Sequence, residues 1–283
     1  MPSNARFTDL VGCELPIQLA AMGGVGTTEL AAAVIAAGGL GMVPRGVQRA
    51  VGVCGVNFLV PFVQSLTEIE AEAATSPVIE FFYGDPRPDL VAAAHAGGAI
   101  VGWQTGSADE AEAAERAGCD YVVVQGIEAG GHVRGTERLD AVVRSARAIV
   151  RVPLLAAGGI ASAARVAAVM ARGADGVRIG TRFVTCPEAD AHPAYVARLL
   201  EADGAETVVT EWFNDGWPAA PHRVLRTALI AAQRSGWRST MPPQRRIDRD
   251  ADDMAMYAGL GVGDVVASEP AERVIGDLSQ GLT

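Results

Sequence analysis

Residues 152–181, VPLLAAGGIASAARVAAVMARGADGVRIGT, contain two strand-and-loop units in succession. An apolar run typical of a buried parallel strand ends at Gly158 and Gly159, and a second such run ends at Gly180 and Thr181. Because glycine has no side chain, the backbone amides at both strand ends are open to a ligand. An alanine-rich helix is expected between the two units, so the stretch has the alternating order of an α/β protein.

The helix between the two glycine loops is expected over residues 163–172, with Ser162 as its N-cap and Gly173 at its end. Backbone amides beside a helix N-terminus favour a phosphate dianion. In eight-stranded α/β barrels the usual phosphate site follows the last two strands. The alternative is that the glycines only make tight turns. Two consecutive glycine loops favour a phosphate site over that alternative.

A second glycine-rich strand end precedes this stretch, at residues 121–132, YVVVQGIEAGGH. Its histidine, His132, follows Gly130 and Gly131 at the carboxyl end of a strand, where the catalytic residues of barrel enzymes gather. An imidazole titrates close to neutral pH. His132 is therefore equally well read as a general acid or base and as a loop histidine, and Glu128 could orient either the loop or the imidazole.

Counting apolar runs outward from these stretches gives eight expected strands, with helices between most of them. The strands are expected at 16–22, 40–43, 55–60, 77–83, 99–104, 120–125, 152–157 and 176–179. Helices are expected at 29–37, 89–96, 107–117 and 139–150, with Ser107 capping the third and Thr27 or Thr28 the first. The number and order predict a (β/α)8 TIM barrel.

Two early parts of the pattern need separate interpretation. Only about a dozen residues separate strands two and three, so we expect the connection between 41 and 55 to be abbreviated or irregular. Asn57, in an apolar strand, either bonds to neighbouring backbone or contacts a cofactor. The first strand end does not fit GxGxxG, which argues against a dinucleotide fold, while Ala21, Met22 and Gly23 are expected to line a ligand pocket.

The strand pattern weakens after residue 182, and a mainly helical C-terminal segment is expected to pack on the barrel as a cap. We divide the chain into a barrel at 1–203 and this segment at 204–283. Helices are expected at 193–202, 223–233, 254–260 and 270–278, an extended segment at 206–213, and a charged loop or linker at 245–253.

Composition narrows the classes of partner. A net charge of −10 argues against nucleic-acid binding, because a surface that follows phosphates needs excess Lys and Arg. No window approaches the roughly 20 apolar residues of a membrane span, and the N-terminus has no basic leader, so we expect a soluble, cytoplasmic protein. The four cysteines have no metal-ligand spacing and read as reduced core residues. A homo-oligomeric state is left open.

The remaining chemistry is sparse. His95 is expected on a helix surface, and His192 and His222, each beside a proline, are expected to be structural. No metal motif and no GxSxG elbow is present, which disfavours metal hydrolysis and hydrolase chemistry. The pattern therefore indicates a phosphate-bearing cofactor with one histidine above it.

The chain resembles the nitronate monooxygenases, formerly called 2-nitropropane dioxygenases, which are FMN-binding barrel proteins. The resemblance covers nearly the whole chain and rests on PIQLAAMGGVGTTELAAAVIAAGGLGM, GVNFLV, QGIEAGGH, LLAAGGI, ADGVRIGTRF, WPAAPHRVLRTAL and MAMYAGLGVG. QGIEAGGH followed by AAGGI and IGTRF is a specific combination. The chain departs from the family in its short 41–55 segment and in lacking an extended tyrosine-containing pocket motif.

The resemblance implies site residues and a reaction. It places Ala21, Met22 and Asn57 along the flavin, and Gln125 and Gly130 at the ring and ribityl chain. It implies that Gly158, Gly159, Gly180 and Thr181 bind the FMN phosphate, with Arg178 adjacent as a source of charge. His132 matches the family's base, which takes the α-proton of a nitroalkane or orients a nitronate, while flavin and O2 convert the substrate to a carbonyl compound and nitrite.

Two alternatives stay open. The FMN-dependent enoyl-acyl-carrier reductases share the glycine-glycine-histidine loop, so an enoyl-thioester reductase using NAD(P)H is the first. A flavin-binding module without turnover is the second.

Overall fold

Eight parallel strands form the centre of the computed structural model, which describes residues 5–282. Residues 1–4 of the expected barrel segment and residue 283 of the expected C-terminal segment lie outside the described residues. The strands are β1 Ile17–Leu19, β2 Gly41–Pro44, β3 Cys54–Leu59, β4 Val78–Phe82, β5 Ile100–Thr105, β6 Tyr121–Gln125, β8 Leu154–Ala157 and β9 Gly176–Ile179. Each overlaps one of the eight expected strands, and their ends differ by a few residues.

The sheet curls until its two edges meet. Its strand order is β1-β9-β8-β6-β5-β4-β3-β2. A bridge between Gln18 and Leu40 joins the first and last strands, and the Leu40 amide donates to the Ile17 carbonyl at 2.9 Å. The expected (β/α)8 TIM barrel is therefore confirmed.

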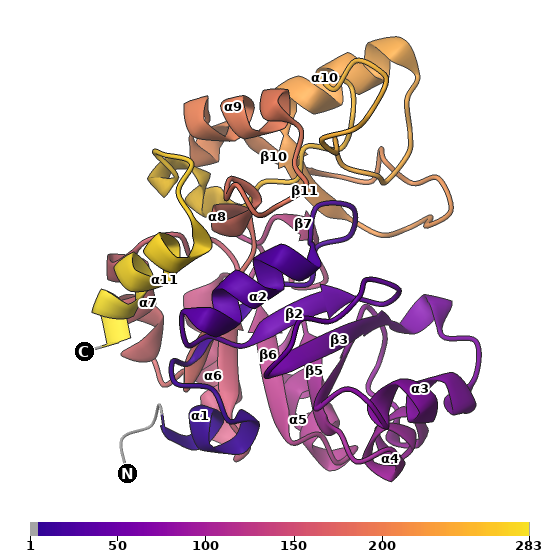
Figure 1. Cartoon of the computed structure of the whole chain (residues 1–283), viewed down its shortest axis with the longest axis vertical. Coiled ribbons are helices and arrows are strands. Elements are labelled where there is room, and N and C mark those ends of the chain that lie inside the picture. The colour runs from indigo at the N-terminus through magenta and orange to yellow at the C-terminus, as the bar shows by residue number, and fades with distance from the viewer. Residues whose placement is uncertain (1–4, 283) are drawn as a thin grey trace.

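Helices follow most strands and cover the outside of the barrel (Figure 1). They are α2 Thr28–Ala36, α3 Leu66–Ala73, α4 Pro88–Ala96, α5 Ala108–Arg116, α6 Leu139–Ile149 and α7 Ala163–Met170. Thr27 caps α2 by accepting from the Leu30 amide, and Ser107 caps α5. The connection between β2 and β3 contains no helix within the described residues, as its length predicts.

The last long helix, α11 Ala271–Ser279, returns to the barrel and lies between α7 and α2 (Figure 1). Its buried face consists of Ala271, Val274, Ile275 and Leu278. This helix occupies the eighth outer position, which the short α8 Thr181–Val184 after β9 leaves uncovered. The C-terminal end of the chain thus supplies the outer helix between α7 and α2. The division at residue 203 stays a prediction.

The chain between α8 and α11 lies over the carboxyl ends of the barrel strands, in the upper part of Figure 1. It contains α9 Pro193–Glu201, β10 Thr207–Thr210, β11 His222–Leu225 and α10 Arg226–Ser235. Strand β11 lies between β10 and β7 Gly131–His132, forming a small antiparallel sheet. The expected helix from residue 223 was therefore wrong at its start, because residues 222–225 pair as a strand.

One further expectation for this region was wrong. Residues 254–259 are irregular rather than helical, because Tyr257 bridges to Val224 of β11, and a short 3-10 turn follows at Leu260–Asp264. In the barrel, Ser162 occupies the expected N-cap position of α7, but its side chain makes no capping bond, since its hydroxyl donates to Asp264 at 2.8 Å. Short 3-10 turns also occur at Val60–Phe62, Gly204–Glu206 and Gln280–Leu282.

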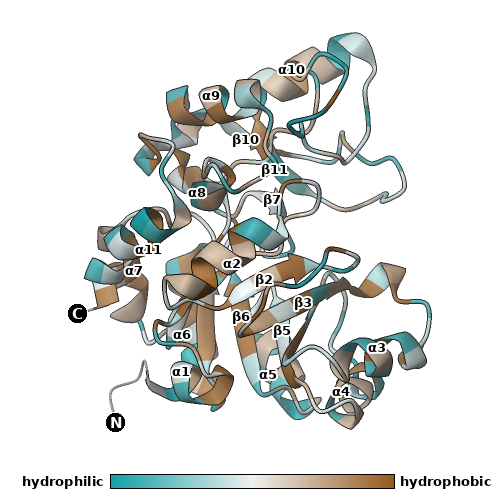
Figure 2. Cartoon of the chain, in the orientation of Figure 1, coloured by the Kyte–Doolittle hydropathy of each residue, from teal (hydrophilic) through white to brown (hydrophobic). Residues whose placement is uncertain are grey.

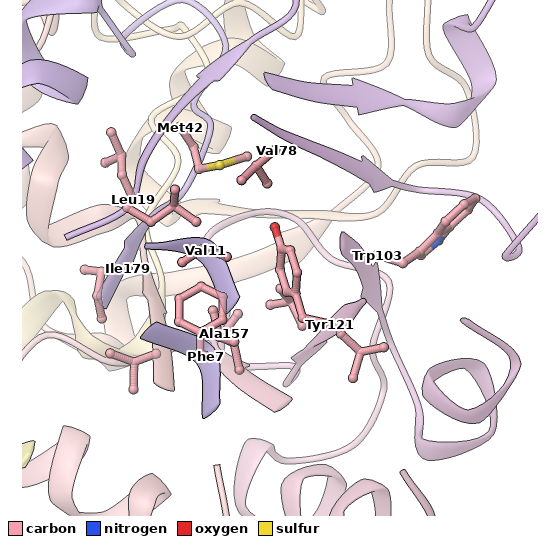
Figure 3. Packing of buried hydrophobic residues seen from close by; sticks show 14 of the residues in the cluster. Phe7, Val11, Leu19, Met42, Val78, Trp103, Tyr121, Ala157 and Ile179 are labelled. Carbon is pink, nitrogen blue, oxygen red and sulfur yellow. The ribbon is translucent and has the colours of Figure 1, made fainter. Parts of the chain in front are cut away.

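The main core fills the barrel and the space between the strands and their helices. Hydrophobic residues concentrate in the strands, whereas the outer helices carry hydrophilic stretches (Figure 2). Helix α1 Ala5–Val11 closes the amino end, where the Phe7 ring contacts Tyr121 edge-on at 5.4 Å (Figure 3). Cys54, Cys119 and Cys186 are buried and unpaired, as expected, while Cys13 is half-buried. Within residues 5–282, no helix combines the length and apolar character needed to cross a bilayer.

Candidate active site

A cavity of about 490 Å³ opens at the carboxyl ends of the barrel strands. Its wall includes every site residue predicted from the sequence, namely Ala21, Met22, Gly23, Asn57, Gln125, Gly130, Gly131, His132, Gly158, Gly159, Arg178, Gly180 and Thr181. These residues lie in β3, β6, β7 and β9 or in the loops that follow β1, β6, β8 and β9, so they come from distant parts of the sequence. The fold therefore brings the predicted residues together, and their individual roles stay predictions.

The glycine loops pack too closely for side chains at several points. Gly158 and Gly159 have φ values of +118° and +65°, which glycine adopts readily. A Cβ on Gly130 would stand 2.5 Å from the Gly259 amide nitrogen. The Thr181 hydroxyl accepts from that same amide at 3.1 Å. Segment 257–261 therefore packs directly against the glycine loops and forms one side of the cavity.

His132 lies in β7, with its imidazole in the cavity wall and its Nε2 atom buried without a hydrogen-bond partner. The Trp217 ring stacks on it, with centroids 3.9 Å apart and planes at 25°. Burial, helped by neighbouring His222, lowers the pKa of His132 to about 3. The imidazole is therefore neutral at pH 7 and has a free nitrogen for a ligand.

His222 was expected to be merely structural, but it lies beside His132. Their rings are 5.3 Å apart, and His222 is fully buried in β11, opposite His132 in the strand register. Its Nδ1 lies 2.9 Å from the Ala220 carbonyl oxygen. No local sequence pattern indicates this proximity, because it follows from the pairing of β7 with β11. Of the other two histidines, His95 is partly exposed and bonds Asp120, and His192 caps α9.

Two aromatic residues near His132 were also missed. Tyr83 follows β4 with a φ of +63° and meets the Trp217 ring edge-on at 4.8 Å. Burial raises the pKa of Tyr83 to about 12, so it stays protonated at neutral pH. A tyrosine at a strand's carboxyl end is a recognisable signal in a barrel, whereas Trp217 stands in a loop whose path only the structure gives.

The side chains of Gln125 and Glu128 form hydrogen bonds within the protein. The Gln125 amide donates to the His132 carbonyl at 2.9 Å and accepts from the Arg134 amide at 2.9 Å, so it fixes the histidine loop. Glu128 accepts from the Leu139 amide at 2.9 Å, so it orients the loop rather than the imidazole. Both side chains therefore support the position of His132.

Arg178, predicted as a source of charge adjacent to the phosphate, has a buried acidic partner. Its guanidinium forms an ion pair with Glu80, a fully buried residue of β4. Strand β4 stands opposite β9 in the closed strand order, so the side chain reaches across the barrel interior. Arg178 consequently lies in the cavity floor, and its charge is not free at the glycine loops.

The residues present fit a flavin. The volume lies in the range of roughly 300–1,000 Å³ that small-molecule sites occupy. A Cβ placed on Gly23 or Gly131 would meet nothing within 4 Å, so the wall leaves open space there. The buried Nε2 of His132 lacks a partner that a bound group could supply.

Comparison with known proteins identifies a family of flavin enzymes, in agreement with a cavity that fits a flavin. The family model for nitronate monooxygenase matches residues 53–266. The chain belongs to the nitronate monooxygenase family. A nitronate monooxygenase of Pseudomonas aeruginosa is 34% identical over 72% of this chain and 76% of its own length. Members are flavin oxidoreductases, so this chain is an enzyme of that class.

Relatives with other names are equally similar. A 5-hydroxy-7a-methyl-1-oxo-octahydro-1H-indene-4-carboxyl-CoA dehydrogenase of Mycobacterium tuberculosis is 32% identical over 84% of this chain and 71% of its own length. The structure of FabK from Thermotoga maritima superposes with a TM-score of 0.81 at 29% identity, covering 98% of this chain and 95% of that one. The family membership therefore leaves the specific reaction open.

Proposed function

We propose that this enzyme is an FMN-dependent nitronate monooxygenase, which oxidises alkyl nitronates with O2 to carbonyl compounds and nitrite. The observation that carries the proposal is the neutral imidazole of His132, with its unpartnered Nε2, in the wall of the glycine-lined cavity. A neutral imidazole is the form that accepts a proton or donates a hydrogen bond to a nitronate oxygen.

The cavity wall offers groups for each part of FMN. Gly158, Gly159, Gly180 and Thr181 line the cavity at two neighbouring strand ends, where their backbone groups suit a phosphate dianion. The same cavity wall contains Ala21, Met22, Asn57, Gly130 and Gly131, which suit the flat ring system. When bound, the flavin supplies the redox chemistry.

His132 then acts on the substrate's proton. Its Nε2 takes the α-proton of a neutral nitroalkane, or orients a nitronate that arrives ionised. Burial gives the imidazole a pKa of about 3, and an anionic group bound beside it raises that pKa. Trp217, stacked on the ring, excludes water from one imidazole face and holds the ring's orientation.

The variant His132→Ala tests this role. It should keep bound flavin while losing turnover of neutral nitroalkanes by roughly 10²- to 10⁴-fold, the usual contribution of a general base. Preformed nitronates, which need no deprotonation, should lose less. Steady-state nitrite release with both substrate forms measures the difference, with surface variant His95→Ala as the control. Equal loss on both substrates would remove the base role.

An enoyl-thioester reductase is the second candidate, because the cavity mouth is apolar. Phe62 and Met241 line it with 43% and 45% of their surfaces exposed, which suits an acyl chain. The similarity to FabK favours the same assignment. Anaerobic mixing separates the candidates: a nitronate that reduces the flavin without NAD(P)H supports the first, and rapid reduction by NAD(P)H followed by reoxidation with an enoyl thioester supports the second. Neither reaction leaves a flavin-binding module.

We also propose a cytoplasmic location. All four cysteines are unpaired, and three are buried, a usage typical of reducing compartments. Cell fractionation with an antibody to the chain would test it.

A further inference from the structure

Glu80 is a fully buried carboxylate that the reaction described above does not use. It accepts from four side chains: Gln18 Nε2 at 2.9 Å, Tyr121 Oη at 3.1 Å, Asn57 Nδ2 at 3.1 Å and the Arg178 guanidinium. These donors come from β1, β6, β3 and β9, so the carboxylate lies near the barrel axis. A buried charge is retained at this cost only when its partners satisfy it.

The Glu80 network is oriented with respect to the cavity. Arg178 and Asn57 line the cavity, whereas Glu80 does not. Because a carboxylate only accepts, Asn57 must turn its Nδ2 toward Glu80, which leaves its Oδ1 for the cavity side. Arg178 uses Nη1 for Glu80, and its other guanidinium hydrogens remain for a ligand. The positive end of the ion pair therefore faces the ligand space.

We propose that Arg178, held by the positioning residue Glu80, is a fixed positive charge in the cavity floor that makes reduced flavin bind more tightly than oxidised flavin. The inference rests on the proposed FMN site. Two-electron reduction adds negative charge to the ring system, and a cation fixed in a water-poor wall favours the more negative form. The amide of Asn57 and the guanidinium together offer an acceptor beside donors, which matches the alternating edge of an imide-containing ring.

The position of the Arg178 guanidinium inside the barrel distinguishes this role from phosphate binding. The guanidinium of Arg178, from β9, pairs with Glu80 of β4, which stands opposite in the strand order, so it points away from the rim where Gly180 and Thr181 lie. A residue that binds the phosphate affects oxidised and reduced flavin equally, since the phosphate charge does not change on reduction. A cation beside the ring system affects them differently, because the ring system gains charge on reduction.

The test measures the dissociation constants of oxidised FMN and of dithionite-reduced FMN, the latter without oxygen, for the full chain. Arg178→Gln should lower the ratio of the oxidised to the reduced constant at least tenfold, equivalent to a midpoint potential about 30 mV lower for a two-electron couple. Arg178→Lys keeps the charge and should keep most of the ratio. A ratio unchanged in Arg178→Gln overturns the proposal.

Glu80→Gln gives the opposite sign and excludes a merely structural role. Removing the compensating carboxylate should raise the ratio, whereas general damage to the site would lower both affinities without this reversal. Tyr121→Phe removes a neutral bond to the same carboxylate and should leave the ratio unchanged.

A double variant tests the proposal even if the single charge variants do not fold. The double variant Glu80→Gln/Arg178→Gln contains no uncompensated buried charge, and its ratio should also fall below that of the wild type. If the wild-type chain binds neither form of FMN, the proposed function fails. If it binds both forms and all charge variants keep the wild-type ratio, this inference alone fails.

Discussion

At the scale of single residues, His132 couples the site to the stability of the chain. The folded imidazole stays neutral down to pH about 3, whereas in the unfolded chain it protonates below about 6.5. Between these values the unfolded state binds one more proton, so the free energy of unfolding falls as the pH falls. We expect a loss of roughly 1 kcal/mol per pH unit between pH 6 and pH 4 from this group.

Urea unfolding at several pH values measures this loss, and His132→Phe is the matched variant because it keeps an aromatic ring against Trp217. Both chains share every other titratable group, so the difference between their stability curves isolates the imidazole. The difference should change with pH below 6.5 and stay constant above it. A difference independent of pH would mean that the folded imidazole protonates normally.

Individual site residues could be predicted from the sequence, but their distant partners could not. His132 could be predicted because it follows two glycines at the end of a recognisable strand. Glu80 was visible as an acid in an apolar strand, yet its partners Gln18 and Arg178 stand 62 and 98 residues away. Such partners depend on how the barrel closes, and periodicity carries no information about closure. Hence the ion pair between Arg178 and Glu80 required the structure.

At the scale of elements, the strands of the barrel were predictable because each is a local apolar run bounded by glycine or polar residues. Strand β11 was not, since residues 222–225 become a strand through pairing with β7 and β10 rather than through their own pattern. That pairing carries the chain past Trp217 and brings His222 beside His132. The element that the local sequence did not predict, β11, therefore belongs to the part of the chain that covers the carboxyl ends of the barrel strands.

The loop after β9 allows a test of the proposed phosphate position. Gly180 has a φ of −116°, and an added Cβ would meet only Ala20, at 3.5 Å, so Gly180→Ala should fold and keep FMN. Gly180→Asp adds a carboxylate beside the proposed phosphate, and repulsion should weaken FMN binding at least roughly tenfold. Fluorescence titration of both purified variants measures this. Equal, wild-type affinity for both would place the phosphate elsewhere.

At the scale of the whole molecule, the two ends of the chain close the barrel in different ways. Helix α1 covers the amino end of the strands, and α11 fills the eighth outer position after the long excursion that roofs the cavity (Figure 1). The roof is therefore held at both of its ends by the barrel, through α8 and α11. Composition and strand counting predicted the barrel, but not that the C-terminal helix belongs to its outer layer.

This arrangement predicts that α11 is required for the stability of the whole barrel. Leu278 is 1% exposed, and Leu278→Ala should lower the free energy of unfolding by about 2–5 kcal/mol, as for other buried leucines. Arg273→Ala, on the exposed side of the same helix, should change it by less than about 0.5 kcal/mol. Circular dichroism and flavin fluorescence, followed during urea unfolding, should report one shared transition that moves to lower urea in Leu278→Ala. If the helix were only an appended cap, the flavin signal would persist after α11 had unfolded, because the cavity would survive without this helix.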